Sequence, residues 1–148
     1  MSIGSNTVLH DVVVYIKSIL QGITDPIVGS RSTSSKFVMT SFPLRGAEYP
    51  LITIECGMNN GRGMGMATEA MEFRNLLRIT IWSKSTKQRD ELCDSVISTL
   101  RNAQLGTGTI SENLYDFIVI NAFDLSEDAG QEKIHRKIIE VSYKFIAE

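Results

Sequence analysis

The clearest pattern of apolar and polar positions runs from Phe73 to Arg101 and predicts a strand that leads directly into a helix. In the strand part, the apolar residues share one side of an extended chain, and they are Phe73, Leu77, Ile79 and Ile81. Arg74, Arg78 and Thr80 share the other side. One face of this strand is therefore expected to be buried, while the other faces solvent or a partner.

The helix that follows is predicted from its cap and its apolar stripe. Ser85 is placed as the N-cap, and the side chain of Gln88, three residues on, is expected to return a hydrogen bond to it in a capping box. Arg89 lies off the stripe, among the polar residues. The stripe repeats at helical spacing and consists of Leu92, Cys93, Val96, Ile97 and Leu100. A strand with one apolar face and a helix with one apolar stripe form a two-layer α/β unit.

An earlier helix is predicted from a cap at Asn6 or Thr7 to about Gln21. Gly22 and Pro26 follow it as stop signals. Its expected apolar stripe consists of Leu9, Val13, Ile16, Leu20 and Ile23, widened by Val12 and Ile19.

Further strands are predicted over four segments, which are Lys36 to Phe42, Leu51 to Cys56, Tyr115 to Leu125 and Lys133 to Ile146. The third is apolar on both faces, which favours a central or doubly covered strand. An acidic turn, Ser126 to Gly130, joins it to the last strand in a hairpin. The whole pattern predicts one α+β domain over residues 1–148. It is a two-layer fold with a mixed or antiparallel sheet of about four to five strands and two main helices on one face.

The segment from Gly57 to Glu72 shows neither the helical nor the strand spacing of apolar residues, and it is predicted to be a long flexible loop. It contains four glycines and four methionines. Loops longer than about 12–15 residues are usually functional or disordered, and methionines suit an adaptable contact surface. We expect this loop to act in assembly and contribute little to folding; the alternative is a hairpin tip without a function. The expected assembly interface is Met58, Asn59, Asn60, Arg62, Met64, Met66 and Met71, with Arg45 and Glu48 from the turn between Pro43 and Pro50.

Composition and charge narrow the class of protein. A hydrophobic content of 43% and a charged content of 22% are typical of a soluble globular domain. A net charge of −2 gives no electrostatic reason to expect sequence-independent DNA binding. Cys56 and Cys93 lie among apolar positions and are expected to be reduced core thiols. With neither a signal peptide nor an apolar run of about 18 residues, we expect a cytoplasm-like, reducing environment.

Candidate chemistry is sparse along the chain. His10 and His135 are isolated from other metal-ligating or catalytic residues. The run from Gly61 to Gly65 imitates a nucleotide-binding loop, yet it lacks the Lys-Ser/Thr of a P-loop and leads towards a strand. Asp124, Glu127 and Asp128 are better explained as a solvated turn than as a cation site. We therefore assign no catalytic residue, cofactor or metal ligand, and expect no enzyme activity.

The order of elements resembles the tail terminator or tail completion proteins of tailed bacteriophages over nearly the whole chain. An N-terminal helix is followed by Tyr49-Pro50-Leu51-Ile52-Thr53-Ile54-Glu55 and a long loop. Then Arg78-Ile79-Thr80-Ile81-Trp82-Ser83 feeds a helix with Asp90, Leu92 and Leu100, and a terminal hairpin ends the chain. The "YP-x-ITIE" strand and the "IWS…D-x-L-x-D" passage carry most of this resemblance.

The resemblance implies a structural virion protein that assembles into a ring, commonly a hexamer. Such a ring caps the head-proximal end of the tail tube, ends its polymerisation and offers a docking surface to the head connector. The implied partners are the chain itself, the tail tube protein and the head-completion or connector protein. Genome DNA passes through the ring lumen without sequence-specific binding, and no membrane is involved. The protein is then located in the tail or neck of the virion after assembly in the host cytoplasm.

Two alternatives remain open at this point. The first is a neighbouring neck protein, such as a head-completion or head–tail adaptor subunit. The second is a small ligand-binding or enzymatic α+β domain that uses residues 57–72 as a lid.

Overall fold

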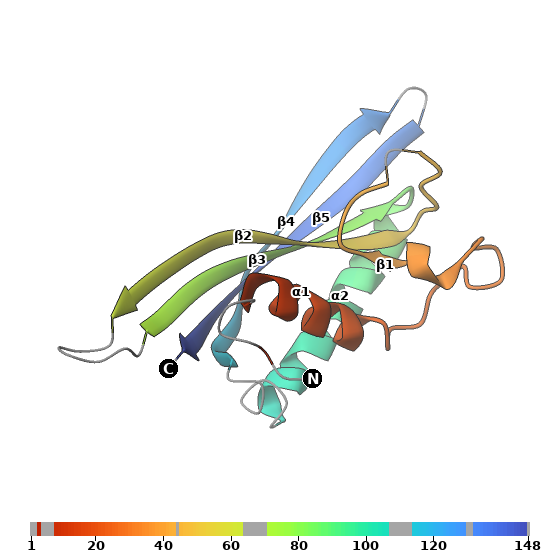
Figure 1. The fold of residues 1–148 in the computed structure, drawn as a ribbon. Helices are drawn as coiled ribbons and strands as arrows, with labels where there is room; N and C mark the ends of the chain where they lie inside the picture. Colours follow the sequence, from red (N-terminus) through yellow and green to blue (C-terminus); the bar gives the residue numbers. More distant parts are fainter. Residues whose placement is uncertain are drawn as a thin grey trace.

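A computed structural model of the chain describes residue 3 and residues 8–43, 45–63, 71–106, 114–129 and 132–147. It contains a five-stranded mixed sheet with two helices packed on one face, which confirms the predicted α+β class (Figure 1). The helices are α1 (Val8–Leu20) and α2 (Thr86–Leu105), and a short 3-10 helix, η1, spans Ser34–Lys36. The strands are β1 (Val38–Met39), β2 (Leu51–Gly63), β3 (Met71–Ser83), β4 (Leu114–Ala129) and β5 (Glu132–Ala147).

The strands lie in the order β1-β2-β3-β5-β4 across the sheet. β1 is parallel to β2, whereas every other neighbouring pair is antiparallel. β4 and β5 form the expected terminal hairpin. In Figure 1 the β2–β3 hairpin extends to the lower left and the connected end of the β4–β5 hairpin extends to the upper right. The sheet is therefore longer than the helices that cover it.

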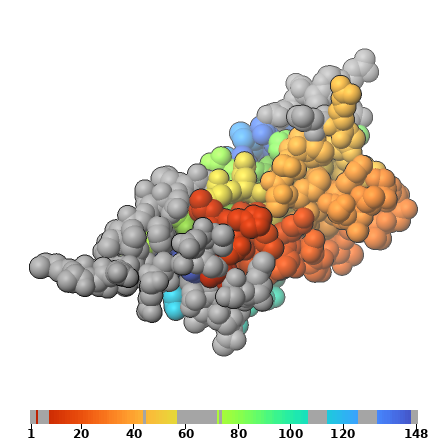
Figure 2. Space-filling view, in the orientation of Figure 1, coloured from red at the N-terminus to blue at the C-terminus, as the bar shows by residue number. Residues whose placement is uncertain are grey.

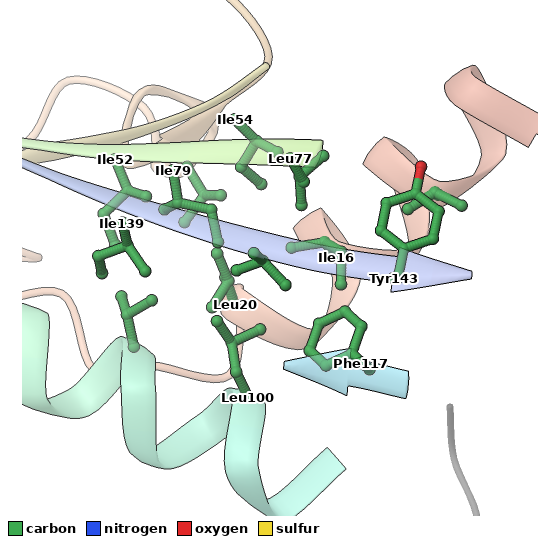
Figure 3. Close-up of a cluster of buried hydrophobic side chains, with 14 of the residues drawn as sticks. Ile16, Leu20, Ile52, Ile54, Leu77, Ile79, Leu100, Phe117, Ile139 and Tyr143 are labelled. Carbon is green, nitrogen blue, oxygen red and sulfur yellow. The ribbon is translucent and has the colours of Figure 1, made fainter. Parts of the chain in front are cut away.

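The hydrophobic core lies between the helices and the sheet. Ile79 and Ile139 on the strands, and Ile16 and Leu100 on the helices, have no exposed surface. Figure 3 shows the helix side chains facing those of the strands. Each fully buried aliphatic side chain of this kind contributes about 1.5–3 kcal/mol relative to an exposed one, so this layer is the main source of stability.

The predicted strand-to-helix unit is confirmed in β3 and α2. Ile79 and Ile81 are fully buried on β3, and Leu92, Val96 and Leu100 are buried on α2. Thr80, expected on the open face, is also buried at 3% exposure, because Thr53 and Ile138 flank it in the neighbouring strands. The helix begins immediately after Ser85, as expected. The hydrophobic period was correctly read here because both elements bury one side against the same core.

The cap of α2 differs from the expected capping box in one contact. The hydroxyl of Ser85 accepts a hydrogen bond from the backbone N–H of Gln88 at 3.5 Å. The side chain of Gln88 does not bond directly to the cap; its Oε1 accepts from the Ser83 hydroxyl at 3.1 Å. That hydroxyl accepts in turn from the backbone N–H of Ser85 at 3.1 Å. Ser83, the last residue of β3, therefore links the strand to the helix terminus.

The stripe predicted for α1 is partly wrong. The buried residues are Val8, Val12, Ile16 and Leu20, which follow one another at intervals of four. Leu9 is exposed instead of buried. Val13, Ile19 and Ile23 are partly buried beside the core. With seven apolar residues among the predicted stripe and its borders, the sequence left the rotation of the helix about its axis undetermined. Asn6 and Thr7, the expected caps, lie outside the described residues.

The strand predicted from Lys36 to Phe42 is much shorter in the structure. Only Val38 and Met39 pair with β2, and Phe37 alone separates them from η1. The chain then leaves the sheet, although Phe42 still stacks on Trp82 with ring centroids 4.4 Å apart. Phe37 and Val38 are buried, whereas Phe42 is 38% exposed, so burial explains the apolar character of only the first part of this segment.

The expectation of a long loop over residues 57–72 is wrong for residues 57–63 and 71–72, which are strand residues, while residues 64–70 lie outside the described residues. Residues 57–63 belong to β2, and β3 begins at Met71, so the two strands pair from Leu51↔Trp82 to Gly63↔Met71. The register shifts between Cys56 and Met58, which places a bulge at Gly57. Glycine and asparagine weaken the strand signal of the sequence, but pairing with β3 fixes this half of β2 in the sheet. Residues 57–63 and 71–72 are therefore part of the fold.

The expected position of the third predicted strand is also wrong. β4 lies at the edge of the sheet, because β5 inserts between it and β3. The expected acidic turn is shorter, since residues 126–129 continue β4 and pair with residues 132–135. A central position therefore does not explain why both faces of this strand are apolar. Several of its apolar side chains are exposed.

Candidate functional site

Most of the predicted interface residues lie on the β2–β3 hairpin. Met58, Asn59, Asn60 and Arg62 are on β2, and Met71 begins β3. Their backbones pair across the hairpin, for example Met58 with Leu76, while their side chains lie outside what the structure describes. Met64 and Met66 lie entirely outside the described residues. The structure thus places five of these seven residues on one hairpin, as strand residues.

The other two predicted interface residues, Arg45 and Glu48, have different surroundings. Arg45 is exposed. The carboxylate of Glu48 accepts hydrogen bonds from the backbone N–H of Ser32 at 3.2 Å and from its hydroxyl at 3.0 Å. Glu48 therefore has a role within the fold, where it holds the segment before β2 against the segment before η1.

An unpredicted arginine organises the same region. Arg31 lies in a Ser/Thr/Gly-rich segment, yet its side chain is only 1% exposed. Its guanidinium binds the Asp25 carboxylate through two N–H groups, at 2.6 and 3.0 Å. The remaining N–H groups donate to the carbonyl oxygens of Lys36 at 3.3 Å, Glu48 at 2.7 Å and Pro50 at 2.5 Å. All five donors of the guanidinium are thereby used.

These bonds hold the irregular segment from residue 25 to residue 50 against the start of β2. Figure 2 shows much of it as one lobe, in orange, beside α1 in red. The Arg31 guanidinium holds the pKa of Asp25 below its usual value through the side-chain hydrogen bond. The Asp25 carboxylate is consequently charged at neutral pH and bound to the guanidinium.

The most distinctive surface feature is an apolar edge strand. Within the described residues, eight large hydrophobic side chains are exposed, and four of them lie on β4. They are Tyr115, Ile118, Ile120 and Leu125, with Ile118 and Ile120 exposed at 50% and 57%. Apolar residues that cluster on a surface, as opposed to scattered ones, mark sites of contact with a partner. We take β4 as the candidate functional site.

The sequence contained one signal for this site. Tyr115 to Leu125 is apolar on both faces, which was interpreted as a buried central strand. An exposed interaction strand produces the same pattern, because a partner buries the face that the domain leaves open. The sequence alone did not distinguish the two explanations.

Next to this edge, the sheet face away from the helices carries cross-strand rows. One row runs from Glu55 through Arg78 and Glu140 to Asn121 and alternates in charge. Another places Trp82 beside Arg136, whose guanidinium lies 4.9 Å from the ring centroid. Opposite charges and cation–aromatic pairs in neighbouring strands favour this register. The apolar residues of β4 therefore border a mixed face, in which charged rows alternate with the row of Thr80, Ile138 and Phe123.

A second charged cluster fixes β4 to α2. Arg89, expected among the polar residues of the helix, is buried and contacts Asp90 at 2.9 Å and Asp124 of β4 at 3.5 Å. Lys137 of β5 binds the same two carboxylates at 3.2 Å each. The hydrogen bonds from Arg89 and Lys137 lower the pKa of Asp90. Burial opposes the charged form of Lys137, but hydrogen bonds to Asp124 and Asp90 raise its pKa overall.

In the described part of the chain, the residues considered above as candidates for chemistry do not come together in a binding or catalytic site. There, no three His, Cys, Asp or Glu side chains are grouped so that they could hold a metal ion. Asp124 binds Arg89 and Lys137, as above, and Gly61 to Gly63 form part of the β2–β3 ladder. Cys56 and Cys93 are free thiols, and burial raises the pKa of each.

A surface depression of about 500 Å³ lies between the end of α1 and β1. Asp25 and Phe37 are among its lining residues. The Asp25 carboxylate is already bound to Arg31, so it is not placed to act as a free acid or base. The depression therefore gives no evidence of a catalytic site.

Comparison with known proteins does not assign the chain to a family. No family model matches the sequence, and no curated protein shows significant similarity to it. In the described part of the chain, neither helix combines the length and the hydropathy needed to cross a bilayer.

Proposed function

We propose that this chain is a structural virion protein of the tail terminator type. In this role it forms a ring at the head-proximal end of a phage tail tube, ends polymerisation of the tube and presents a docking surface to the head connector. Its partners are further copies of itself, the tail tube protein and the head-completion or connector protein. No step in this role requires a catalytic residue or a cofactor.

The observation that carries the proposal is the exposed apolar edge of the sheet. Tyr115, Ile118, Ile120 and Leu125 are exposed along one strand at the border of the sheet, where a second polypeptide can cover both side chains and the adjacent backbone. A small ligand is usually bound in a concave pocket with a few converging polar groups. The exposed side chains of β4 lie instead on a strand at the border of the sheet.

A second observation concerns the two passages on which the resemblance rests. The strand that begins at Leu51 and the strand that ends at Ser83 are direct neighbours, with Leu51 opposite Trp82. The indole N–H of Trp82 donates to the Thr53 hydroxyl at 3.0 Å. The two passages thus form one structural unit at the start of α2, which supports treating them as parts of a single motif.

The lid alternative loses the support of residues 57–63 and 71–72, while residues 64–70 lie outside the described residues. It required residues 57–72 to form a long loop, whereas residues 57–63 and 71–72 are paired strand residues. The neck-protein alternative remains the competitor to be separated by experiment.

The first test is self-association. Light scattering over micromolar concentrations, with and without the tail tube protein, should show a species several times heavier than 16.5 kDa. A strict monomer under both conditions would count against a ring subunit of either kind.

The second test separates the terminator from a neck protein. Tails assembled without this chain should be over-long if it ends tube polymerisation, and electron microscopy measures their length directly. Tails of normal length that fail to join heads would instead place the protein in the neck. Normal-length tails that join heads would contradict both roles.

A further inference from the structure

The sheet presents two strand edges that lack a strand partner. At one end, β1 pairs with only Ile52 and Thr53 of β2. Among the described residues, no strand pairs with the outer edge of β2 from residue 54 to residue 63, or with the outer edge of β4. Unpaired strand edges present rows of free N–H and C=O groups and are templates for pairing with another chain.

The two edges have matching directions. β2 is antiparallel to β3, β3 is antiparallel to β5, and β5 is antiparallel to β4. β2 and β4 therefore run in opposite directions within one copy. A second copy, related to the first by rotation about an axis roughly along the strands, brings its β2 next to β4 in an antiparallel arrangement. The alternation of strand directions then continues across the junction.

Both edge strands carry exposed side chains. In Figure 1 the outer half of β2 projects beyond α1, and β4 forms the opposite border of the sheet. Ile118 and Ile120 are exposed on β4, and Glu55 is exposed on β2. The start of β4 contains a bulge, with Asp116 at φ +48° and register shifts on either side of residues 118–119. The strand regains regular pairing from Asn121 onward.

Charge favours pairing between unlike edges over pairing between two copies of β4. The sequence of β4 contains four acidic residues and no basic residue. Asp116 and Asp124 are paired with Lys144, Arg89 and Lys137 of the same subunit, which reduces the repulsion between two β4 strands, but no basic residue of β4 could turn it into attraction. Residues 54–63 of β2 contain one acidic and one basic residue and are neutral overall. The edge of β4 therefore meets less repulsion at β2 than at a second β4.

We infer that β4 of one copy pairs antiparallel with the outer half of β2, residues 54–63, of the next copy. The contact is head to tail, so it uses two different surfaces of each subunit and closes into a ring when the rotation permits. The inference rests on the self-association in the proposed function and names the surfaces that produce it. It also assigns a partner to the exposed apolar residues of β4.

The first experiment places lysine on the β4 edge. Ile118→Lys combined with Ile120→Lys should weaken self-association by about tenfold or more, because lysine on an edge strand opposes pairing with another chain. The matched control is Val28→Lys combined with Leu105→Lys, which changes two residues exposed at 73% and 83% away from β4. Analytical ultracentrifugation measures the association, and circular dichroism verifies that both variants fold.

The outcomes separate this inference from the proposed function. Loss of the oligomer in the β4 variant alone supports the inference. An oligomer that survives in the β4 variant overturns it while leaving the virion role in place, since tail length is measured independently. Equal loss in both variants also overturns it, because the effect would then not be specific to β4.

The second experiment distinguishes head-to-tail pairing from pairing between two β4 edges. Glu55→Cys on β2 and Asn121→Cys on β4 are introduced at exposed positions of the same cross-strand row, in a Cys56→Ser background. A long bifunctional maleimide should link the double variant into a ladder of multimers, while neither single variant forms more than traces of dimer. Efficient dimers from Asn121→Cys alone would overturn the inference.

Discussion

The β3–α2 unit and the segment from residue 25 to residue 50 are neighbours in the fold but are held by different forces. In the first, Ile81 and Leu100 are fully buried and Leu92 is 3% exposed, so apolar packing dominates. In the second, only Val38 and Met39 join the sheet. There the chain is held by the five N–H groups of Arg31 and the oxygen atoms that accept from them.

Because of this difference, the two regions should lose stability in different ways when a side chain is replaced. An apolar layer loses stability roughly in proportion to the volume removed, because neighbouring atoms partly relax into the gap. A buried arginine with every donor bonded behaves otherwise. Its removal leaves a carboxylate and several carbonyl oxygens without their partner at once. The polar region should therefore be more sensitive to one substitution.

The largest expected effect comes from removing that arginine. Arg31→Met keeps much of the side-chain volume but leaves Asp25 and three carbonyl oxygens without their donor. It should lower the free energy of unfolding by about 3–5 kcal/mol, measured by chemical denaturation. Arg45→Met, at an exposed arginine of the same segment, is the control and should change it by about 0.5 kcal/mol or less. Similar losses in the two variants would show that the network is not what holds the segment.

A slightly smaller loss is expected in the apolar unit. Ile81→Ala and Leu92→Ala should each cost about 2–5 kcal/mol, through lost burial and the cavity left behind. Ser95→Ala, at an exposed position of α2, serves as the control with little expected change. If either core variant were as stable as the control, the strand-to-helix layer would not be the packed core described here.

The cap between the two core elements should matter less. Ser85→Ala removes the hydroxyl that accepts from the Gln88 N–H and should cost about 0.5–2 kcal/mol. Denaturation of Ser85→Ala, Ile81→Ala and Leu92→Ala in parallel ranks them. A ranking with Ser85→Ala as the most damaging of the three would contradict apolar packing as the dominant force in this unit.

The smallest effect is a difference in acid sensitivity. Because the folded-state pKa of Asp25 is lowered, its ion pair contributes stability above the ordinary value of 3.8, and this contribution is lost as the pH falls through the folded pKa. Asp25→Asn should therefore lose less stability than the wild type as the pH is lowered below about 4. Chemical denaturation at several pH values measures this slope. Asp94→Asn, at an exposed aspartate, is the control, and an identical slope in Asp25→Asn and wild type would contradict the ion-pair effect.

The sequence by itself determined which segments form helices and strands, provided that one side of the segment packs against the core. The order of helices and strands, the β3–α2 junction and the terminal hairpin follow from apolar periods and from Ser85. These signals are local, because residues a few positions apart decide whether a strand or a helix presents an apolar side. The candidate site was predicted only in part: the sequence showed that β4 is apolar, but it did not show that β4 is exposed.

Only the tertiary structure decided the features that depend on distant neighbours. The insertion of β5 between β3 and β4 makes β4 an edge strand, and pairing with β3 draws residues 57–63 into the sheet. Arg31 is buried because carbonyl oxygens of Glu48 and Pro50, 17 and 19 residues away, lie within reach of its guanidinium. The spacing of apolar residues along the chain indicates which side chains are buried. It does not indicate which strand, carbonyl oxygen or second molecule lies next to them.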